Sequence, residues 1–417
     1  MKTFSILTLG CRVNQYDSEV LRELGEKEGY LPASDRKQAD LVILDACTVT
    51  QGADGEVGRL LRRARKQNPK AILALVGCLP PNVSFSEADW ILPGRKKFSL
   101  FERLAGRNGE PDSHWPQSLT RFEGHRRPIL KVQDGCRFQC AFCAVPAVRG
   151  GILSRPLDLI LAEARDLAAT GAKEVVLAGI QLSSYGMDQG KKSADPRLEP
   201  VIRALLEIPG LKRVRLSSYG VSDFEEQLRP LFREGTLCPH LHLPLQSGDE
   251  GILKAMKRPY TLDKFRSLVS GLRGEIPEMG LTTDLIAGFP GETDEAFENT
   301  LRRIREFGFQ DFHPFPYSER PGTAAQSMGP KVSDAIVKSR MERLLSLKRE
   351  LLKETFEVWR DRVVEVVAEN HSPAYYGATT QSGVKLWVPR QGEFLGKEIR
   401  VRITDLQNGQ ILAVQVE

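Results

Sequence analysis

The sequence predicts an α/β protein in three consecutive parts: an N-terminal βαβ domain with a parallel sheet, a central partial (β/α)6 barrel, and a small C-terminal β-barrel. Two series of alternating strand-like and helix-like stretches are separated at 105–128 by a polar stretch rich in Gly and Pro, and short β runs follow residue 356. A chain of 417 residues is also too long for one ordinary hydrophobic core. The predicted domains are 1–112, 122–356 and 357–417.

The first series predicts a parallel sheet. Strand-like and helical stretches alternate at 4–9, 17–28, 41–44, 56–66 and 71–76. A cysteine follows shortly after each of the three strands: Cys11, Cys47 and Cys78. Because parallel strands end at the same edge of a sheet, these cysteines are expected to converge, and a metal site is one interpretation. The alternative is three cysteines that act as small buried hydrophobic side chains.

The second series predicts six strands of an open barrel, then a long amphipathic helix and a β domain. The strands are expected at 129–132, 174–178, 213–216, 241–243, 281–286 and 310–315, with helices such as 157–169 and 295–307 between them. The long helix is expected at 332–359. Short β runs at 363–367, 384–388, 398–403 and 411–416 predict the terminal β-barrel.

A compact cysteine triplet follows the first barrel strand. Cys136, Cys140 and Cys143 share one loop, at the face where such barrels carry their catalytic residues. Three thiolates are one fewer than a structural zinc or an iron–sulfur cluster normally takes, so a metal centre on either triplet keeps one coordination position open. Alternatives for the compact triplet are a structural loop and a zinc site completed by His125, which lies upstream of the strand. Cys238 belongs to neither triplet and is interpreted as an inert buried thiol.

The compact triplet, with Phe142 before its last cysteine, resembles the signature of the radical S-adenosylmethionine (SAM) enzymes. Further motifs along the whole chain resemble those of the methylthiotransferases of that superfamily: Thr8-Leu-Gly-Cys11-Arg-Val-Asn14, Pro146-Ala-Val-Arg149-Gly150, Ser154-Arg155-Pro156, Leu243-Pro-Leu-Gln246-Ser-Gly248, Asp284-Leu-Ile-Ala-Gly288-Phe-Pro-Gly291-Glu292 and Tyr317-Ser-Glu-Arg320-Pro-Gly322-Thr323. The C-terminal β domain looks like the TRAM domain of that family, which binds RNA or substrate.

The resemblance implies a transferase that inserts a methylthio group at an unactivated C–H bond by radical chemistry, with SAM and two 4Fe-4S clusters as cofactors. It assigns the cluster that binds SAM to the compact triplet and an auxiliary cluster to Cys11, Cys47 and Cys78, with no catalytic residue beyond these ligands. Candidate SAM contacts, each with turn formation as the alternative, are Phe142, Arg149, Gly179, Gln181, Ser183, Ser217, Ser218 and Gly288. The chain departs from the family pattern at Ser217-Ser-Tyr219 and at Lys257-Arg258-Pro259-Tyr260.

The residues after Cys11 bear on the substrate. Arg12-Val13 resembles the branch that acts on N6-threonylcarbamoyladenosine at tRNA position 37 and places the methylthio group at C2 of the adenine. The alternatives are another tRNA adenosine, since the isopentenyladenosine branch tends to show Gln-Met there, and a ribosomal-protein aspartate, whose branch tends to show Lys-Asn. An alternative of another class is a non-catalytic, metal-containing RNA-binding protein.

The charge is compatible with tRNA as a partner but does not establish one. The formal net charge is +5 at pH 7, and seven Lys and Arg face eight Asp and Glu from Glu357 onward. Basic residues that could contact phosphates, with a solvated surface as the alternative, are Arg59, Arg62, Arg63, Arg65, Lys66, Arg95 to Lys97 and Arg126 to Arg127. The resemblance also implies an electron donor of the flavodoxin or ferredoxin type. No long apolar run or signal peptide is seen, which predicts a cytoplasmic protein without membrane contact.

Overall fold

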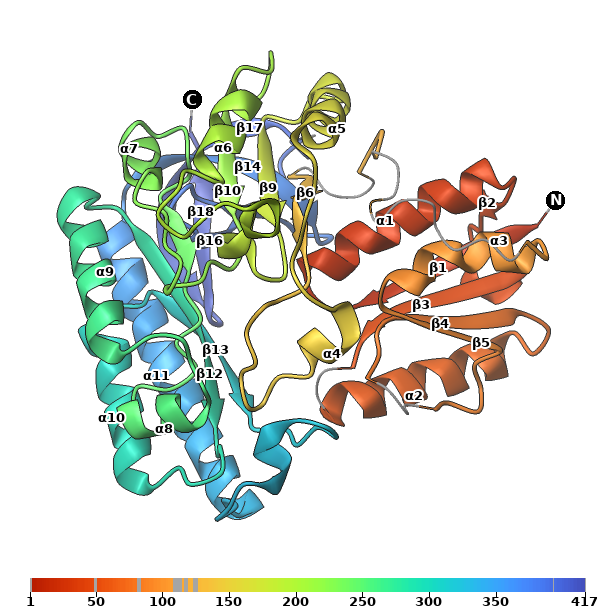
Figure 1. The fold of residues 1–417 in the computed structure, drawn as a ribbon. Coiled ribbons are helices and arrows are strands. Elements are labelled where there is room, and N and C mark those ends of the chain that lie inside the picture. The colour runs from red at the N-terminus through yellow and green to blue at the C-terminus, as the bar shows by residue number, and fades with distance from the viewer. Residues whose placement is uncertain are drawn as a thin grey trace.

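The structure is a computed structural model that describes residues 2–48, 51–80, 84–107, 115, 119–122, 127–392 and 394–416. Figure 1 shows three parts in chain order. A small sheet domain in red and orange lies beside a larger curved sheet in yellow to cyan, and a long helix leads to a β-barrel in blue. The predicted fold class is therefore confirmed.

The N-terminal domain is a parallel sheet with helices on both faces. Its strands, in the order β2-β1-β3-β4-β5, are β1 (Thr3–Leu9), β2 (Leu31–Pro32), β3 (Leu41–Cys47), β4 (Ile72–Cys78) and β5 (Trp90–Pro93). Helices α1 (Arg12–Lys27) and α3 (Leu100–Leu104) pack on one face through Leu21 and Phe101, and α2 (Gln51–Gln67) packs on the other through Val57. Strands β2 and β5 were not predicted from the sequence, because strands of two and four residues are too short to show a period.

Six parallel strands form a curved sheet that does not close. Two sets, β10-β9-β6 and β11-β12-β13, are joined by backbone bridges from Val214 to Leu237 and from Ser218 to His242. The strands are β6 (Ile129–Lys131), β9 (Glu174–Ala178), β10 (Arg213–Leu216), β11 (His240–His242), β12 (Gly280–Ala287) and β13 (Asp311–Pro316). Within the described residues β6 and β13 do not pair, so the barrel is open on that side as predicted, and α1 packs against β6 there.

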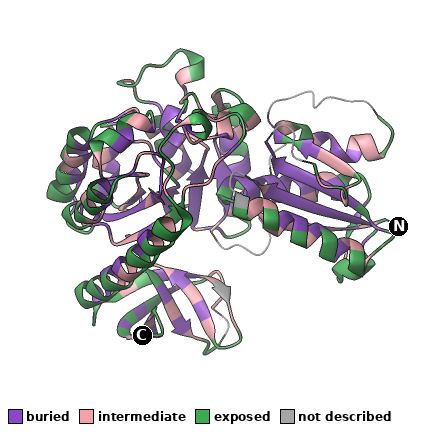
Figure 2. Ribbon diagram, turned by 90° about the horizontal axis from the view of Figure 1, so that it is seen from below, coloured by how far each residue is buried: buried purple, intermediate pink, exposed green. Residues whose placement is uncertain are grey.

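Helices cover the outer face of the curved sheet. They include α5 (Leu157–Ala169), α7 (Leu228–Arg233), α9 (Leu262–Glu275) and α10 (Asp294–Glu306), whereas α4 (Val145–Arg149) lies against β4 of the N-terminal domain. Figure 2 shows the strands as largely buried and the outward faces of the helices as exposed. The main hydrophobic core lies between these two layers and contains Leu241, Leu281 and Phe312 from the strands and Phe265 and Ile304 from the helices.

A long helix connects this sheet to the C-terminal β-barrel. Helix α11 (Asp334–Trp359) packs against β13, and its last residues, Phe356 and Trp359, enter the core of the β-barrel. The barrel is closed in the order β14-β15-β16-β18-β17, with β14 (Val363–His371), β15 (Tyr375–Thr379), β16 (Lys385–Pro389), β17 (Glu398–Gln407) and β18 (Gln410–Gln415). Strand β15 was not predicted, since Gly377 interrupts its short β-prone run. Among the described helices, none has the length and apolarity needed to cross a bilayer.

Part of the expected linker at 105–128 binds both neighbouring domains. Residues 108–114, 116–118 and 123–126 lie outside the described residues. Of the rest, Thr120 donates its backbone N–H to Glu23 on α1 at 2.7 Å, and Leu119 donates its N–H to Glu163 on α5 at 3.1 Å. The domain boundaries at 112 and 122 stay predictions.

The curved sheet and the β-barrel meet at a tight junction. Arg215 on β10 donates to the backbone oxygens of Thr380 and Gln381 at 3.0 Å each, and Arg213 pairs with Glu398 at 2.7 Å. At Gly280, the first residue of β12, a Cβ atom would lie 1.8 Å from the backbone oxygen of Ser382. The absence of a side chain at Gly280 therefore lets the two domains touch.

We expect Gly280→Ala to lower the free energy of unfolding by about 1–3 kcal/mol, because the backbone of the β-barrel must move away from the added methyl group. The matched control is Gly274→Ala on α9, where a Cβ atom meets nothing within 4 Å and the change should stabilise the helix by up to ~1 kcal/mol. Urea unfolding measures both, and equal stability of the two variants would contradict this account of the junction.

Candidate metal centres and active site

The three dispersed cysteines lie together at one edge of the N-terminal sheet. In the pairing of β1 with β3, Leu9 is opposite Ala46, and in the pairing of β3 with β4, Cys47 is opposite Cys78. Cys11 follows β1 and caps the N-terminus of α1, and a Cβ atom on Gly10 would lie 3.0 Å from the Cβ of Cys47. The strand ends therefore bring the cysteines together in the way that the sequence predicted.

The surroundings of Cys78 favour its thiolate. The Nε of Arg149 donates to the Sγ of Cys78 at 2.8 Å. A hydrogen bond from Cys47, with the charges of Arg149 and Lys97, outweighs burial and lowers the pKa of Cys78 to about 6. Because metals bind thiolates, a cysteine that is largely ionised at neutral pH suits a metal ligand.

Six buried charges lie between the N-terminal sheet and the barrel, and we call them the six-charge cluster: Asp17, Asp45 and Lys97 from the N-terminal domain, and Lys131, Asp134 and Arg149 from the barrel domain. Lys97 contacts Asp17 at 2.6 Å and Asp45 at 3.2 Å. Lys131 contacts Asp17 and Asp134 at 2.8 Å each, and Arg149 contacts the same two carboxylates at 3.2 and 3.1 Å. Each of the three cations therefore contacts two carboxylates.

The six-charge cluster contacts the dispersed cysteine triplet and lies close in the chain to the compact one. On one side, Arg149 reaches Cys78, and Asn14 connects Asp45, at 3.0 Å, with the thiol of Cys11, at 3.4 Å. On the other side, Asp134 lies two residues before Cys136. Burial favours neutral carboxyl groups, but Lys131, Lys97 and Arg149 hold the pKa of Asp17 well below its usual range, so the acid is ionised.

The compact triplet lies in a loop after β7 (Gln133–Asp134) that two backbone contacts shape. The N–H of Cys136 donates to the backbone oxygen of Gly150 at 3.1 Å. Gly135, at φ +72°, approaches Gly151 so closely that a Cβ atom would lie 1.8 Å from its oxygen. All three cysteines line one cavity of about 170 Å³.

Three of the predicted SAM contacts also line this cavity: Phe142, Gln181 and Ser218. The Oε1 of Gln181 lies 3.8 Å from the Sγ of Cys136. The cavity thus joins the strand ends of β9 and β10 to the cysteine loop. Three thiols with aromatic and polar side chains around one recess fit a thiolate-held cluster with a small organic ligand beside it.

The other predicted SAM contacts do not line the cavity. The three guanidinium nitrogens of Arg149 bind Cys78, Asp134 and Asp17. The N–H of Gly288 donates to Glu292 at 2.7 Å, and a Cβ atom there would clash with Val337 of α11. As SAM contacts, Arg149 and Gly288 stay predictions.

The remaining candidates shape the wall of the cavity from behind. Gly179 allows close approach of Gln133, whose Oε1 would lie 2.8 Å from an added Cβ atom. Ser183 accepts a hydrogen bond from the Nε2 of Gln181 at 2.8 Å, and Ser217 is buried. As SAM contacts, these three residues stay predictions.

Arg258 was not predicted as a site residue. Its Nη1 donates to the Sγ of Cys140 at 3.2 Å, and its guanidinium lies 5.0 Å from the ring centre of Tyr260. The hydroxyl of Tyr260 donates to the backbone oxygen of Pro244 at 2.8 Å, which fixes the pair in the cavity wall. The departure from the family pattern at Lys257-Arg258-Pro259-Tyr260 was the only sequence signal for it.

Several residues of the expected basic surface are paired or buried. Arg62 lies 3.9 Å from Glu87 and Arg65 lies 2.7 Å from Asp89. Lys97 belongs to the six-charge cluster, and Arg127 is largely buried 3.2 Å from Glu174, so neither can contact phosphates. Arg126 lies outside the described residues. Arg63 and Lys66 remain exposed on α2.

Comparison with known families and proteins agrees with this geometry. Residues 130–304 match the radical SAM superfamily, and residues 3–87 match the uncharacterized protein family UPF0004. A threonylcarbamoyladenosine tRNA methylthiotransferase of Chlamydia pneumoniae is 36% identical over 389 residues, which cover 89% of this chain and 90% of that protein. The chain belongs to the radical SAM tRNA methylthiotransferases.

Other relatives are named for two different modified adenosines. A threonylcarbamoyladenosine tRNA methylthiotransferase of Thermotoga maritima is 33% identical and covers 100% of this chain and 98% of its own. A tRNA-2-methylthio-N(6)-dimethylallyladenosine synthase of Methylacidiphilum infernorum is 34% identical and covers 97% and 93%. The family therefore makes this methylthiotransferase a transferase that uses SAM and a 4Fe-4S cluster, without fixing its nucleoside.

A solved structure supports the fold. The radical SAM methyltransferase TsrM of Kitasatospora setae, with cobalamin and a 4Fe-4S cluster bound, matches with a TM-score of 0.56. The match covers 78% of the methylthiotransferase and 77% of TsrM at 16% sequence identity.

We expect Lys97→Met to lower the free energy of unfolding by about 3–5 kcal/mol, because the carboxylates of Asp17 and Asp45 lose a buried cation. The control is Lys70→Met, which removes an exposed lysine of the same domain and should change stability by less than ~0.5 kcal/mol. Urea unfolding of the iron-loaded protein compares them. A loss below ~1 kcal/mol for Lys97→Met would show that the six-charge cluster does not stabilise the interface.

Proposed function

We propose that this enzyme inserts a methylthio group at C2 of N6-threonylcarbamoyladenosine at tRNA position 37, with one 4Fe-4S cluster on each cysteine triplet. The observation that carries the proposal is that the strand ends gather one three-cysteine set, which Arg149 of the six-charge cluster contacts at Cys78, while the second set lines the cavity. Each set leaves one coordination position of its cluster for another ligand.

The residues around the compact triplet would hold its cluster and SAM. When bound, these cofactors supply a carbon radical that can take hydrogen from an unactivated C–H bond. Cys136, Cys140 and Cys143 provide the ligands, and Arg258 donates a hydrogen bond to the sulfur of Cys140. Gln181 and Ser218 present polar groups to SAM, and Phe142 keeps part of the wall apolar.

Cys11, Cys47 and Cys78 would hold the auxiliary cluster, which presents the sulfur to be transferred. The six-charge cluster fixes this edge of the sheet against the barrel, because every one of its residues is buried and contacts an opposite charge. The two triplets are thereby held in one orientation while substrate binds between the domains.

Arg12 supports the choice of nucleoside. Val13 packs against Ile129 and Ala178 of the barrel, which places Arg12, the first residue of α1, at the open side of the barrel next to Cys11. Within the described residues, no hydrogen bond or ion pair engages its guanidinium. The side chain of Arg12 is exposed to solvent.

Charges of both signs lie around Arg12, namely Arg127 and Arg215 with the acids Glu174 and Glu369. Burial, with the charges of Arg127 and Arg215, lowers the pKa of Arg12 to about 10. Those two arginines and Arg213 all pair with the same acid, Glu174, at 3.2, 2.7 and 3.0 Å. The threonyl part of N6-threonylcarbamoyladenosine carries a carboxylate, which the exposed guanidinium of Arg12 would bind, whereas a dimethylallyl group carries no charge.

We expect Arg12→Gln to lower kcat/KM for tRNA that carries threonylcarbamoyladenosine by about 10- to 100-fold, because a charged hydrogen bond to the substrate is lost. Arg233→Gln, at the exposed end of α7, is the matched control and should act like the unchanged protein. Nucleoside mass spectrometry after incubation with SAM measures the product on tRNAs with either modified adenosine.

The outcomes separate the substrate from the role of Arg12. Methylthiolation of the dimethylallyl substrate alone would overturn the proposed nucleoside, and no methylthio nucleoside on any tRNA would favour a protein substrate. If the protein modifies the threonylcarbamoyl substrate and Arg12→Gln has an unchanged kcat/KM, Arg12 does not take part in substrate recognition.

We expect the reconstituted protein to hold roughly eight irons, and about four after replacement of either complete triplet with Ala. Only the variant of Cys136, Cys140 and Cys143 should also lose cleavage of SAM. Cys238→Ala is the control, since that thiol is buried, and burial raises its pKa to about 12. Anaerobic iron analysis tests this, and zinc without iron would refute the enzyme proposal.

The proposal extends to the cellular partners that the family resemblance implies. The electron would come from a flavodoxin or ferredoxin type of donor, and the enzyme would act in the cytoplasm. The near-neutral C-terminal barrel would contact tRNA by shape rather than by charge alone.

A further inference from the structure

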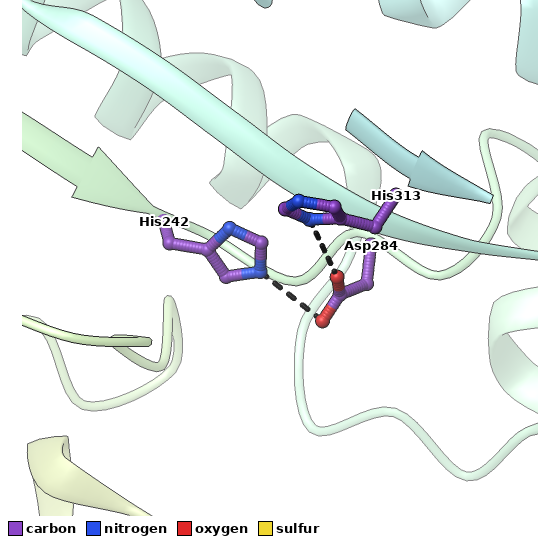
Figure 3. Close-up of side chains that lie close together, drawn as sticks. All are labelled: His242, Asp284 and His313. Carbon is purple, nitrogen blue, oxygen red and sulfur yellow. Dashed lines mark ion pairs between the residues drawn. The ribbon is translucent and has the colours of Figure 1, made fainter. Parts of the chain in front are cut away.

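Two histidines and an aspartate converge on three neighbouring strands of the curved sheet. His242 ends β11, Asp284 lies in β12 and His313 lies in β13. The register places Asp284 opposite His313, and His242 opposite Thr282, two residues before Asp284. Figure 3 shows both imidazole rings turned toward the carboxylate of Asp284.

These side chains face the interior of the barrel. Successive residues of a strand point to opposite faces, and the neighbours Leu241, Leu285 and Phe312 are buried in the core beneath the outer helices. His242, Asp284 and His313 have 13%, 27% and 44% of their side chains exposed. A small ion can therefore reach them from the interior.

The separations of the three groups match those of ligands around one metal ion. The Nε2 of His242 lies 3.1 Å from Oδ2 of Asp284, and the Nδ1 of His313 lies 3.4 Å from Oδ1. One ligand atom from each residue falls within 4.8 Å of the other two. Neighbouring ligands with bonds of about 2.1 Å are roughly 3–3.5 Å apart at tetrahedral or octahedral angles.

A second layer of contacts orients His242. Its Nδ1 is hydrogen-bonded to Oγ1 of Thr282 at 3.0 Å, and the same hydroxyl contacts the Nε2 of His240 at 3.2 Å. The ring therefore presents Nε2 to Asp284. Histidines that bind metals are held in this way by a hydrogen bond at the other ring nitrogen.

We propose that His242, Asp284 and His313 bind one divalent ion of the Fe²⁺ or Mn²⁺ class, at a third centre distinct from both cysteine triplets. Two imidazoles and one carboxylate are a ligand set typical of such ions, whereas thiolates suit clusters and zinc. Three protein ligands leave coordination positions open toward the barrel interior.

The position of this centre relates it to the cavity of the compact triplet. Ser218, in the wall of that cavity, forms a backbone bridge with His242, and Gln246, also in the wall, forms one with Leu285, next to Asp284. The centre thus uses the same strands as the cavity. An oxygen atom of a molecule bound in the barrel could occupy an open position.

Titration of the full-length protein, with its iron–sulfur clusters reconstituted, against Mn²⁺ tests the proposal. Mn²⁺ prefers nitrogen and oxygen ligands to thiolates, and its free aqua ion gives an electron paramagnetic resonance signal that disappears on binding. We expect saturation at one Mn²⁺ per chain. His313→Gln and Asp284→Asn should each weaken binding by about tenfold or more, and Thr282→Val should weaken it by about tenfold through His242.

Asp263→Asn is the control, because it removes a carboxylate that is 90% exposed on α9, and it should leave Mn²⁺ binding unchanged. His313 is the most exposed of the three ligands, so His313→Gln carries the test even if Asp284→Asn fails to fold. Absence of saturable Mn²⁺ binding, or equal binding in His313→Gln and the unchanged protein, would overturn the proposal. The methylthiolation assay on tRNA tests the proposed function separately, so its outcome does not depend on Mn²⁺ binding.

Discussion

Six buried charges connect the N-terminal sheet to the barrel, and the relative position of the two cysteine triplets depends on them. Lys131 and Arg149 of the barrel domain both contact Asp17 of α1, and Lys97 joins Asp17 to Asp45. Burial of one unpaired charge costs several kcal/mol, so the two domains can approach only in the orientation that pairs all six. Hydrophobic packing alone would let the two domains slide against each other. Paired buried charges prevent such sliding, because it would separate the partners.

This constraint explains why motif residues that are far apart in the chain contact one another across the domain interface. Asp17 follows the first cysteine and Arg149 follows the compact triplet, yet they meet across the interface at 3.2 Å. The resemblance alone suggested a contact of Arg149 with SAM, whereas the structure uses it to bind Cys78 and two carboxylates. The proposed radical reaction, with one cluster on each domain, would require such fixed geometry, because a misplacement of about 1 Å can cost 100-fold in rate.

Local patterns in the sequence predicted most of the fold, including the parallel sheet, the open barrel and the convergence of Cys11, Cys47 and Cys78. Those features follow from periodicity and from the rule that parallel strands end at one edge. Contacts between distant residues were not predictable, since no local pattern pairs Arg258 with Cys140 or His242 with His313. Lys97 shows the limit most clearly: the charged run from Arg95 to Lys97 looks solvated, but the side chain of its last residue is 1% exposed.

A double-mutant cycle between Asp17 and Lys131 tests the central claim most directly. The free energy of unfolding is measured for the iron-loaded protein, for Asp17→Asn, for Lys131→Met and for both changes together. If the pair fixes the interface, the double variant should be more stable than the sum of the single losses predicts, by about 1.5–3 kcal/mol. Additivity within ~0.5 kcal/mol would contradict the account, because the two charges would then act independently across the interface.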